Sequence, residues 1–596
     1  MERDYAEATA RTRRFLASRY PLVACLPGTP DYPGGHTRWR EVWAVDVGEP
    51  TPGKEGVRII LAIPTTFPDT FPQAFLPVGM SGSARIPHLD RRRMLCTFDP
   101  TEAQTNSDFP EDIALAVLER AEAEFRDGVV GINHNDFADE FAAYWADADG
   151  AAEALSLVPP GETEARIATF TLTPAWAGAR WFFAAAKDEG ERWLSSVGYA
   201  GKATATRSIY VPLASLGIPP YPVTNGELHG RLSAEDAKGL ERIYAFLSDH
   251  GRPTRILASV PASSGRVLVA WEHPQYCRTV MGKRGLRQVA GPIPGFRAES
   301  QPASLEVSKL NAKARLLRAS VTDVTPERLA RRTAGRTPQV VPGPCNVVGC
   351  GSVGGFLAHE LARAGRASEV RLVDTQVLTA ENTPRHLCGM GSVGSAKADA
   401  VAREIGRHFP HVPCTAHRAD VLDLLRVESD RLAGASLTVV ALGSFAAERR
   451  INRVLHANTA SLQPPVCFVW VEPFLYGGHA VYLGNNGPGC FECLFGEDFR
   501  FSHRVVSDPA RFNMREAGCQ STYVPYSGAD TVAFISACLR FLRSCEGSTE
   551  NVALTWTGDL DAARAADVPL QPQYSMPFSS LTRPVVPNHG CPACSR

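Results

Sequence analysis

A glycine turn followed by polar side chains offers the clearest chemistry in this chain. Residues 347–355 read Val-Val-Gly-Cys-Gly-Ser-Val-Gly-Gly, a G-x-G-x-x-G pattern formed by Gly349, Gly351 and Gly354 after an apolar run. A strand that opens through such a turn into a helix directs backbone N–H groups at a phosphate. The charged and amide side chains that follow are Asp374, Asn382, Arg385 and Lys397. Together they suit a nucleoside triphosphate under attack by a carboxylate, and they predict an adenylating enzyme.

The same glycine turn also occurs in dinucleotide-binding proteins. Asp374 follows Gly354 by twenty residues, the distance at which an acidic residue holds the ribose of a dinucleotide. The turn taken alone therefore leaves a dehydrogenase or a flavoprotein open.

Two C-x-x-C pairs lie near the C-terminus. They consist of Cys490 with Cys493, and Cys591 with Cys594. Four thiolates in tetrahedral geometry are typical of structural zinc. A thioredoxin-like redox role is the alternative, but the second pair lies two residues from the end of the sequence and has no βαβ entry. Structural zinc is the favoured interpretation.

Cys96 lies in a polar, basic segment, eight residues after His88. The stretch 64–72, rich in proline and phenylalanine, follows a strand-like run further upstream. A thiol is a nucleophile when it ionises, and the arginine run 91–93 would lower the pKa of Cys96 and favour the thiolate. Such a run of charge is also typical of solvated surface.

Cys519 lies in the polar stretch 516–526, next to a glycine and before an expected helix over 529–542. Core packing explains this setting poorly, so Cys519 is a second candidate nucleophile. The cysteines in glycine turns or apolar runs are interpreted as buried structural residues: Cys350, Cys388, Cys467, Cys538 and Cys545.

Composition narrows the class of protein. The chain has 596 residues, enough for three to four domains of about 150 residues. A net charge of -1 gives no general attraction to nucleic acid or to an anionic membrane. No apolar stretch approaches 20 residues and the N-terminus lacks a signal-peptide core, so a cytoplasmic location is expected. In a reducing cytosol, 15 cysteines favour metal binding or catalysis over disulfides.

Three regions differ in their hydrophobic pattern. Residues 1–150 combine strand-like runs with helices, the last expected over 135–145. Residues 151–325 carry further strand-like runs and a helix over 233–248, and predict an α+β linker or docking domain. Residues 326–596 alternate strands and helices, and predict a Rossmann-like domain with a mainly parallel sheet. The predicted fold class is α/β.

The residues after the glycine turn resemble the ThiF/MoeB superfamily, the adenylating domain of ubiquitin-activating enzymes. The resemblance rests on the blocks 374–386 and 394–398, with an acidic residue after the second strand, an N-x-x-R element and a lysine at the next helix start. It implies that Asp374 holds the ribose of ATP. It also implies that three side chains grip the phosphates as pyrophosphate leaves: Asn382, Arg385 and Lys397.

The same resemblance extends to metals and subunits. Magnesium is expected with the ATP, although Ser444 stands where the family usually has a magnesium-binding aspartate. Many ThiF-like proteins bind zinc through C-x-x-C pairs near the C-terminus, and the fold usually forms homodimers. Arg331 or Arg332 is a candidate for reaching the second subunit's site, and a solvated helix face is an equal alternative.

The N-terminal region resembles ubiquitin-conjugating domains, in which strands and a proline-rich segment precede a histidine-proline-asparagine turn and the reactive cysteine. His88 takes the place of the asparagine. The resemblance implies that Cys96 is a transfer cysteine and that a ring N–H of His88 steadies an oxyanion. In activating enzymes, the thiol that attacks the acyl adenylate has a place comparable to that of Cys519.

The order of domains resembles the bacterial fusion proteins that join a conjugating and an activating domain in CBASS antiphage systems. The resemblance implies ATP-dependent adenylation of a partner protein's C-terminus, a thioester on Cys519, transfer to Cys96, and an isopeptide bond to a lysine of a target. The implied partner is the CBASS nucleotide cyclase. Such a chain is a ligase and transferase with ATP, Mg²⁺ and Zn²⁺ as cofactors.

Two other functions remain compatible with the sequence. One is an activating enzyme for a sulfur carrier or a ubiquitin-like protein, without conjugation, which leaves Cys96 unexplained. The other is a non-catalytic adaptor, which has no use for all four polar residues at the nucleotide site.

Overall fold

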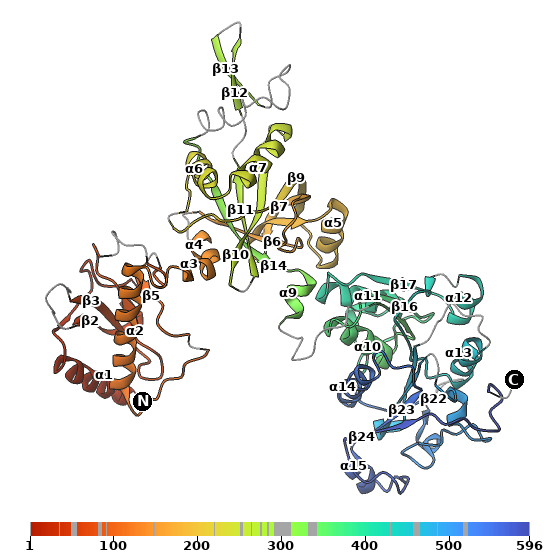
Figure 1. Cartoon of the computed structure of the whole chain (residues 1–596). Helices are drawn as coiled ribbons and strands as arrows, with labels where there is room; N and C mark the ends of the chain where they lie inside the picture. The colour runs from red at the N-terminus through yellow and green to blue at the C-terminus, as the bar shows by residue number, and fades with distance from the viewer. Residues whose placement is uncertain are drawn as a thin grey trace. The chain divides into compact units, whose positions relative to one another are not determined.

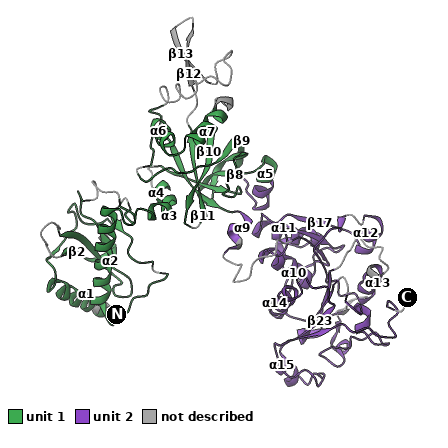
Figure 2. Ribbon diagram, in the orientation of Figure 1, with its two compact units in different colours: residues 1–190, 201–324 green, residues 191–200, 325–596 purple. Residues whose placement is uncertain are grey.

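The computed structural model describes residues 2–594 except 35, 49–55, 81–85, 91, 100, 147–149, 220, 251–253, 264, 274–276, 283–284, 291–311, 332–342, 429–430, 457–464, 485–486 and 516–521. The chain divides into two compact units (Figure 2), one of residues 1–190 and 201–324, the other of residues 191–200 and 325–596. Among the described helices, none has the length and apolar character needed to cross a bilayer.

An antiparallel sheet and two long helices make up the first domain (Figure 1). The strands pair in the order β1-β2-β3-β4-β5, with bounds β1 Leu22–Ala24, β2 Trp39–Val47, β3 Val57–Pro64, β4 Gln73–Phe75 and β5 Met94–Leu95. Helix α1 (Glu2–Ala17) packs on α2 (Pro110–Val130), which packs on β3 and β4. Side chains of β3 alternate between faces, so Ile59 joins the core under α2 while Ile60 packs in a second cluster.

Two short helices follow, α3 (Asp136–Asp139) and α4 (Phe141–Ala146). The prediction of a single helix over 135–145 is wrong, because Glu140 between them has φ -89° and ψ 4°, which ends the helical run. We call residues 136–146 the strap.

The middle domain is a closed seven-stranded barrel with strand order β10-β11-β14-β6-β8-β7-β9. The strands are β6 Ala152–Ser156, β7 Ala165–Trp176, β8 Ala179–Ala184, β9 Lys202–Pro212, β10 Thr254–Ala262, β11 Gly265–His273 and β14 Leu317–Asp323. The hairpin β12 (Cys277–Gly282) with β13 (Gly285–Ala290) extends from it.

Helices accompany the barrel: α5 Lys187–Ser196, α6 Asn225–Glu235, α7 Ala237–His250 and, after the barrel, α9 Pro326–Ala330. The single helix predicted over 233–248 is in fact part of α6 and α7. Asp236 separates them because its φ of -156° and ψ of 77° lie outside the helical region. Residues from α7 and from the barrel strands share one core that includes Leu247, Ile256 and Trp271.

The C-terminal unit is built on an eight-stranded sheet in the order β17-β16-β15-β18-β19-β20-β23-β24. The bounds are β15 Pro344–Val348, β16 Glu369–Val373, β17 Cys414–His417, β18 Leu437–Val440, β19 Val466–Val471, β20 Gly477–Leu483, β23 Val552–Thr557 and β24 Ser580–Pro584. The strands from β17 to β19 are parallel, and the last three are antiparallel. The predicted α/β class with a mainly parallel sheet is confirmed.

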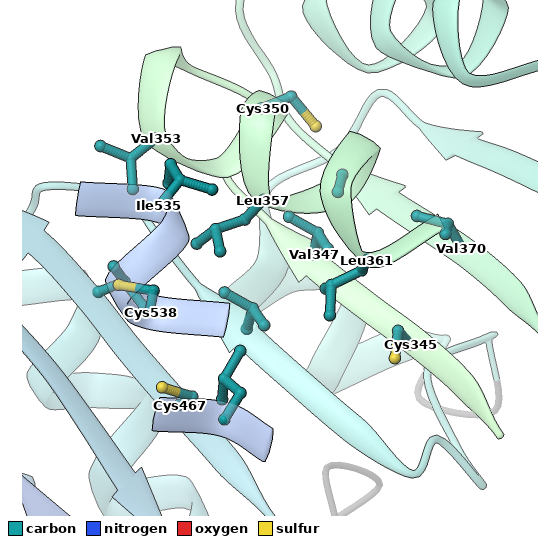
Figure 3. Packing of buried hydrophobic residues seen from close by; sticks show 14 of the residues in the cluster. Cys345, Val347, Cys350, Val353, Leu357, Leu361, Val370, Cys467, Ile535 and Cys538 are labelled. Carbon is teal, nitrogen blue, oxygen red and sulfur yellow. The ribbon is translucent and has the colours of Figure 1, made fainter. Parts of the chain in front are cut away.

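Helices cover both faces of this sheet. They are α10 Ser352–Arg363, α11 Lys397–His408, α12 Val421–Val427, α13 Phe445–His456, α14 Gly528–Ser544 and α15 Leu560–Ala565. Val347 of β15 packs under α10 and α14 with Leu357 and Ile535 (Figure 3), whereas its neighbour Val348 joins a separate core with residues of α12 and α13. Burial on both faces explains the continuous apolar runs of these strands.

Candidate functional site

The glycine turn lies between β15 and α10, where close backbone contacts require glycine. A Cβ on Gly349, whose φ is +90°, would lie 2.4 Å from the carbonyl oxygen of Ala441, and one on Gly354 would lie 1.8 Å from the oxygen of Gly349. A Cβ on Gly351 would meet nothing within 4 Å, and Gly351 lines a cavity. The first and third glycines therefore close the turn, while the second keeps the approach to the α10 N-terminus open.

Asp374, at the carboxyl end of β16, stabilises this turn. Its carboxylate accepts hydrogen bonds from the backbone N–H groups of Cys350 and Gln376, both at 2.7 Å. It also lines a cavity of about 270 Å³ together with Asp420, Leu442 and Ser444. The predicted ribose-binding residue thus lies at the end of a parallel strand, where ligands bind in open α/β sheets.

A neighbouring cavity of about 370 Å³ brings together the three residues expected at the phosphates: Asn382, Arg385 and Lys397. Lys397 is only 8% exposed, and its Nζ donates to Oε1 of Gln376 at 2.7 Å. Burial lowers the pKa of Lys397, the charge of Arg385 adds to that effect, and the charge of Asp374 opposes it. This cationic lining suits an anionic ligand.

Two residues of this cavity were not predicted from the sequence. Tyr526 lies with its ring under the guanidinium of Arg385, at 5.4 Å, and its hydroxyl 2.5 Å from Oγ of Ser352 at the start of α10. Glu448 of α13 is 3% exposed and accepts from the backbone N–H of Gly443 at 3.0 Å. Burial raises the pKa of Glu448 to about 7. Among the described residues that line this cavity, Glu448 is the one carboxyl group.

The four cysteines of the C-x-x-C pairs come together, with all four sulfur atoms within 4.8 Å of one another. Neighbouring sulfurs are 3.5 to 3.8 Å apart. Tetrahedral zinc with Zn–S bonds of about 2.3 Å separates its sulfurs by about 3.8 Å. The donor set and its spacing therefore fit zinc.

Side chains of α13 hold the first C-x-x-C pair in place. Glu492, between Cys490 and Cys493, accepts hydrogen bonds from Arg449 and Arg453 at 2.7 to 3.0 Å. Asn452 donates to Glu492 at 3.2 Å and to the sulfur of Cys490 at 3.4 Å. The helix that carries Glu448 is thus tied directly to the cysteine cluster.

Cys519 lies outside the described residues. The strands that flank it in sequence, β21 (Met514–Arg515) and β22 (Thr522–Tyr523), pair with each other. Val524 lines the 370 Å³ cavity. Of the two candidate arginines, Arg331 is exposed at the end of α9, and Arg332 is outside the described residues.

Cys96 is exposed and follows β5, at a cavity of about 450 Å³ that His88 also lines. Its backbone N–H donates to the carbonyl of His88 at 2.8 Å. Partial burial raises the pKa of the Cys96 thiol, and the charges of Glu140 and Asp90 raise it further. The expectation that the pKa of Cys96 is lowered is therefore wrong among the described residues, and Arg91 of the arginine run lies outside them.

Arg93 of the arginine run has partners other than the thiol. Its guanidinium donates to the carbonyl of Leu76 at 2.8 Å and pairs with Asp31 at 3.6 Å. The guanidinium of Arg93 therefore stabilises the turn, in which Arg93 has a positive φ of 67°.

His88 lies in the turn before Cys96 with φ 63°, a conformation that few residues other than glycine adopt. Its Nδ1 is 2.8 Å from Oε1 of Glu140, and its Nε2 is 3.1 Å from Oδ2 of Asp136. The hydrogen bond with Glu140, assisted by Asp136, raises the pKa of His88 to about 9. As an imidazolium it donates to both carboxylates, so a bond to an oxyanion requires the release of one of them.

Comparison with known proteins assigns both ends of the chain. Residues 343–560 match the ThiF family, and residues 38–152 match prokaryotic E2 family B. The chain is 24% identical over 465 residues to the ATP-dependent ubiquitin transferase-like protein Cap2 of Pseudomonas aeruginosa, which covers 75% of this chain and 78% of the relative. It is 23% identical over 199 residues to the Cap2 protein of Vibrio cholerae, or 32% of this chain and 33% of that one. The predicted resemblance to fused conjugating and activating domains is confirmed.

Among solved structures, Escherichia coli MccB with ATP is similar at 16% identity and a TM-score of 0.29, covering 45% of this chain and 69% of that one. MccB with AMPCPP and MccA gives 15% identity and a TM-score of 0.30, over 45% of this chain and 69% of that one.

Proposed function

We propose that this chain uses ATP to activate the C-terminal carboxylate of a partner protein, carries the acyl group on two cysteines and joins it to a lysine. The observation that carries the proposal is the 370 Å³ cavity, where Arg385 and Lys397 face a glycine turn and a helix N-terminus in a chain that also bears an E2 family domain. The likeness to an ATP-dependent ubiquitin transferase-like protein supports an enzyme of the activating and conjugating class.

The first step is adenylation. The partner's carboxylate oxygen attacks the α-phosphorus of ATP, the bond to the β-phosphate breaks, and pyrophosphate leaves. Lys397 and Arg385 offset the charge that accumulates on the leaving phosphates, and Asn382 supplies an amide donor. Asp374 holds the ribose while it fixes the glycine turn through Cys350.

Magnesium bound with the ATP would offset part of the phosphate charge. Glu448 lines the cavity and bonds to the backbone of Gly443, next to Ser444, where the family's aspartate is missing. We therefore assign to Glu448 the role of magnesium ligand, for which the sequence pattern offers no aspartate at position 444.

The later steps move the acyl group. The thiolate of Cys519 attacks the acyl carbon, and AMP leaves. The thiolate of Cys96 attacks that thioester, and the thiolate of Cys519 leaves. The neutral amine of a target lysine then attacks the thioester carbon, the carbon–sulfur bond breaks, and the sulfur of Cys96 takes up the proton that the nitrogen loses. The whole-chain resemblance points to a CBASS nucleotide cyclase as the conjugated partner and to a homodimeric enzyme.

Intact mass spectrometry without reductant tests the relay. Wild type, Cys519→Ala and Cys96→Ala are each mixed with ATP, magnesium and proteins encoded by the flanking genes. We expect a reductant-sensitive adduct that is absent in Cys519→Ala, and that stays on the activating domain in Cys96→Ala. The appearance of the adduct on Cys96 in Cys519→Ala would refute the order of transfer.

Two further assays separate the alternatives. An adaptor would show no exchange of pyrophosphate into ATP. An activating enzyme without conjugation would show exchange and a thioester, but no lysine-linked product.

A further inference from the structure

The strap, residues 136–146, is built into the barrel. Trp145 is completely buried, its Nε1 donates to the carbonyl of Ala270 at 3.1 Å, and its ring contacts the ring of Trp271. Phe141 packs edge-on against Tyr221 at 4.7 Å in the same core. Asp139 accepts from the backbone N–H of Ser263 at 2.8 Å. The position of the strap is thus set by the middle domain.

The same strap forms a wall of the Cys96 cavity, to which it contributes Glu140, Ala143, Tyr144 and Ala146. The carboxylate of Glu140 contacts His88 twice, through the ring at 2.8 Å and through the backbone N–H at 2.9 Å. Tyr144 donates to Glu140 at 2.8 Å and accepts from the backbone N–H of Leu89 at 3.3 Å. Three of these hydrogen bonds connect the strap to the turn that precedes Cys96, and the bond from Tyr144 to Glu140 lies within the strap.

We propose that the barrel is part of the conjugation site, because it holds the strap against Cys96 and thereby places Glu140 to position the cationic amine of the acceptor. This inference rests on the proposed function and deepens it: Glu140 becomes a positioning residue that favours lysine as the acceptor.

The charges around the cavity favour a cation. Glu140 and Asp90 line it, and Asp136 lies behind His88. Two of the described positive groups nearby are already paired: His88 with Glu140 and Asp136, and Arg120 with Glu124 at 2.7 Å. The carboxylates of Glu140 and Asp90 attract an approaching lysine ammonium. This attraction raises the local concentration of lysine near the thioester.

The aminolysis itself balances without a further reactant. The ammonium gives one proton to water, the amine nitrogen bonds to the thioester carbon, and the carbon–sulfur bond breaks. The sulfur of Cys96 leaves with the bonding electrons and takes up the second proton that the nitrogen loses.

The test measures discharge of a chemically loaded Cys96, so that it does not depend on the adenylating half. Full-length wild type and Glu140→Gln are acylated with the 2-mercaptoethanesulfonate thioester of acetylglycine. After removal of the reagent, Nα-acetyl-lysine or dithiothreitol is added, and freed thiols are alkylated at each time point. The acyl and alkylated forms are counted by mass on the tryptic peptide 94–120, in which Cys96 is the only cysteine.

Loss of the Glu140 charge should slow discharge to Nα-acetyl-lysine about tenfold, through a higher half-saturating lysine concentration. Discharge to dithiothreitol should not slow, because its reactive form is an anion that the carboxylate repels. Glu119→Gln, which removes an exposed carboxylate of α2 outside the cavity, is the matched control and should behave as wild type.

Trp145→Phe tests the role of the barrel, because it keeps a ring in the barrel core and removes the bond to Ala270. We expect slower discharge to lysine with an unchanged rate to dithiothreitol. Equal slowing of both nucleophiles in Glu140→Gln would mean that Glu140 only maintains the fold, and no slowing of either would also overturn the proposal. Slowing in Glu140→Gln but not in Trp145→Phe would overturn the contribution of the barrel.

Outcomes for the proposed function are separate. If wild type never forms an ATP-dependent adduct with any partner, but its chemically loaded thioester shows the Glu140 effect, the relay fails and the amine site stands.

Discussion

The ring of Tyr526 lies under the guanidinium of Arg385, with 5.4 Å between the guanidinium carbon and the ring centroid. The contact joins the loop before α14 to the N-x-x-R element of the nucleotide site. Because a cation over an aromatic face contributes about 0.5 to 1 kcal/mol at an accessible site, Tyr526 helps to orient the arginine that we assign to the phosphates.

Replacement of Tyr526 should therefore affect ATP binding in a graded way. Tyr526→Phe keeps the ring and loses only the hydroxyl contact with Ser352, so the KM for ATP in pyrophosphate exchange should change less than about twofold. Tyr526→Ala removes the ring, and the KM should rise by about threefold to fivefold. Equal effects of the two substitutions would show that the hydroxyl, and not the ring, is what matters.

Glu448→Gln should change the dependence of pyrophosphate exchange on magnesium. The substitution keeps an acceptor for the backbone N–H of Gly443. It removes the negative charge of the carboxylate that we propose as a magnesium ligand. We expect the half-saturating magnesium concentration to rise about tenfold or more, while the variant can still be saturated with ATP. Glu360→Gln is the control, because Glu360 pairs with Arg363 on α10 away from the cavity. An unchanged magnesium titration would refute the assignment.

Much of the candidate nucleotide site could be predicted, because the residues that come together at its cavity lie in short stretches of sequence. Gly349 and Gly354 are required by close backbone contacts, and Asp374 directly follows the strand Glu369–Val373, which pairs with β15. The fold of the C-terminal unit could be predicted for a related reason, since its strands are buried on both faces and are continuous apolar runs in the sequence.

Residues that act through the tertiary fold could not be found in this way. Glu448 follows Ser444 by one helical turn. This spacing indicates a role for Glu448 only when α13 is known to begin at the cavity. Glu140 is 52 residues from His88 in sequence. The prediction of one helix over 135–145 is wrong at the same residue. The local sequence pattern is helical, but the backbone of Glu140 between α3 and α4 is not.

Removal of zinc should destabilise the C-terminal unit and weaken ATP binding together. Glu492 of the first C-x-x-C pair binds Arg449 and Arg453, which follow Glu448 by one and five residues on the same helix. We expect one zinc per chain by elemental analysis, lost in Cys591→Ser, with a Tm lowered by several degrees. The KM for ATP should rise in the same variant. A Cys414→Ser control, which changes a cysteine outside the cluster, should keep its zinc. Full zinc content in Cys591→Ser would contradict the assignment.

The pair His88 and Glu140 predicts how stability depends on pH. The pKa of His88 is raised from 6.5 to about 9, mainly by Glu140, so the folded state binds the proton more tightly than the unfolded state. Its contribution to the free energy of unfolding is fully present below pH 6.5 and is lost as the pH rises through about 9. Glu140→Gln should lower the pKa of His88 and flatten this dependence between pH 6.5 and 9. Thermal unfolding of both proteins from pH 6 to pH 10 measures the difference. Parallel curves for wild type and Glu140→Gln would show that His88 is not held as a cation by the strap.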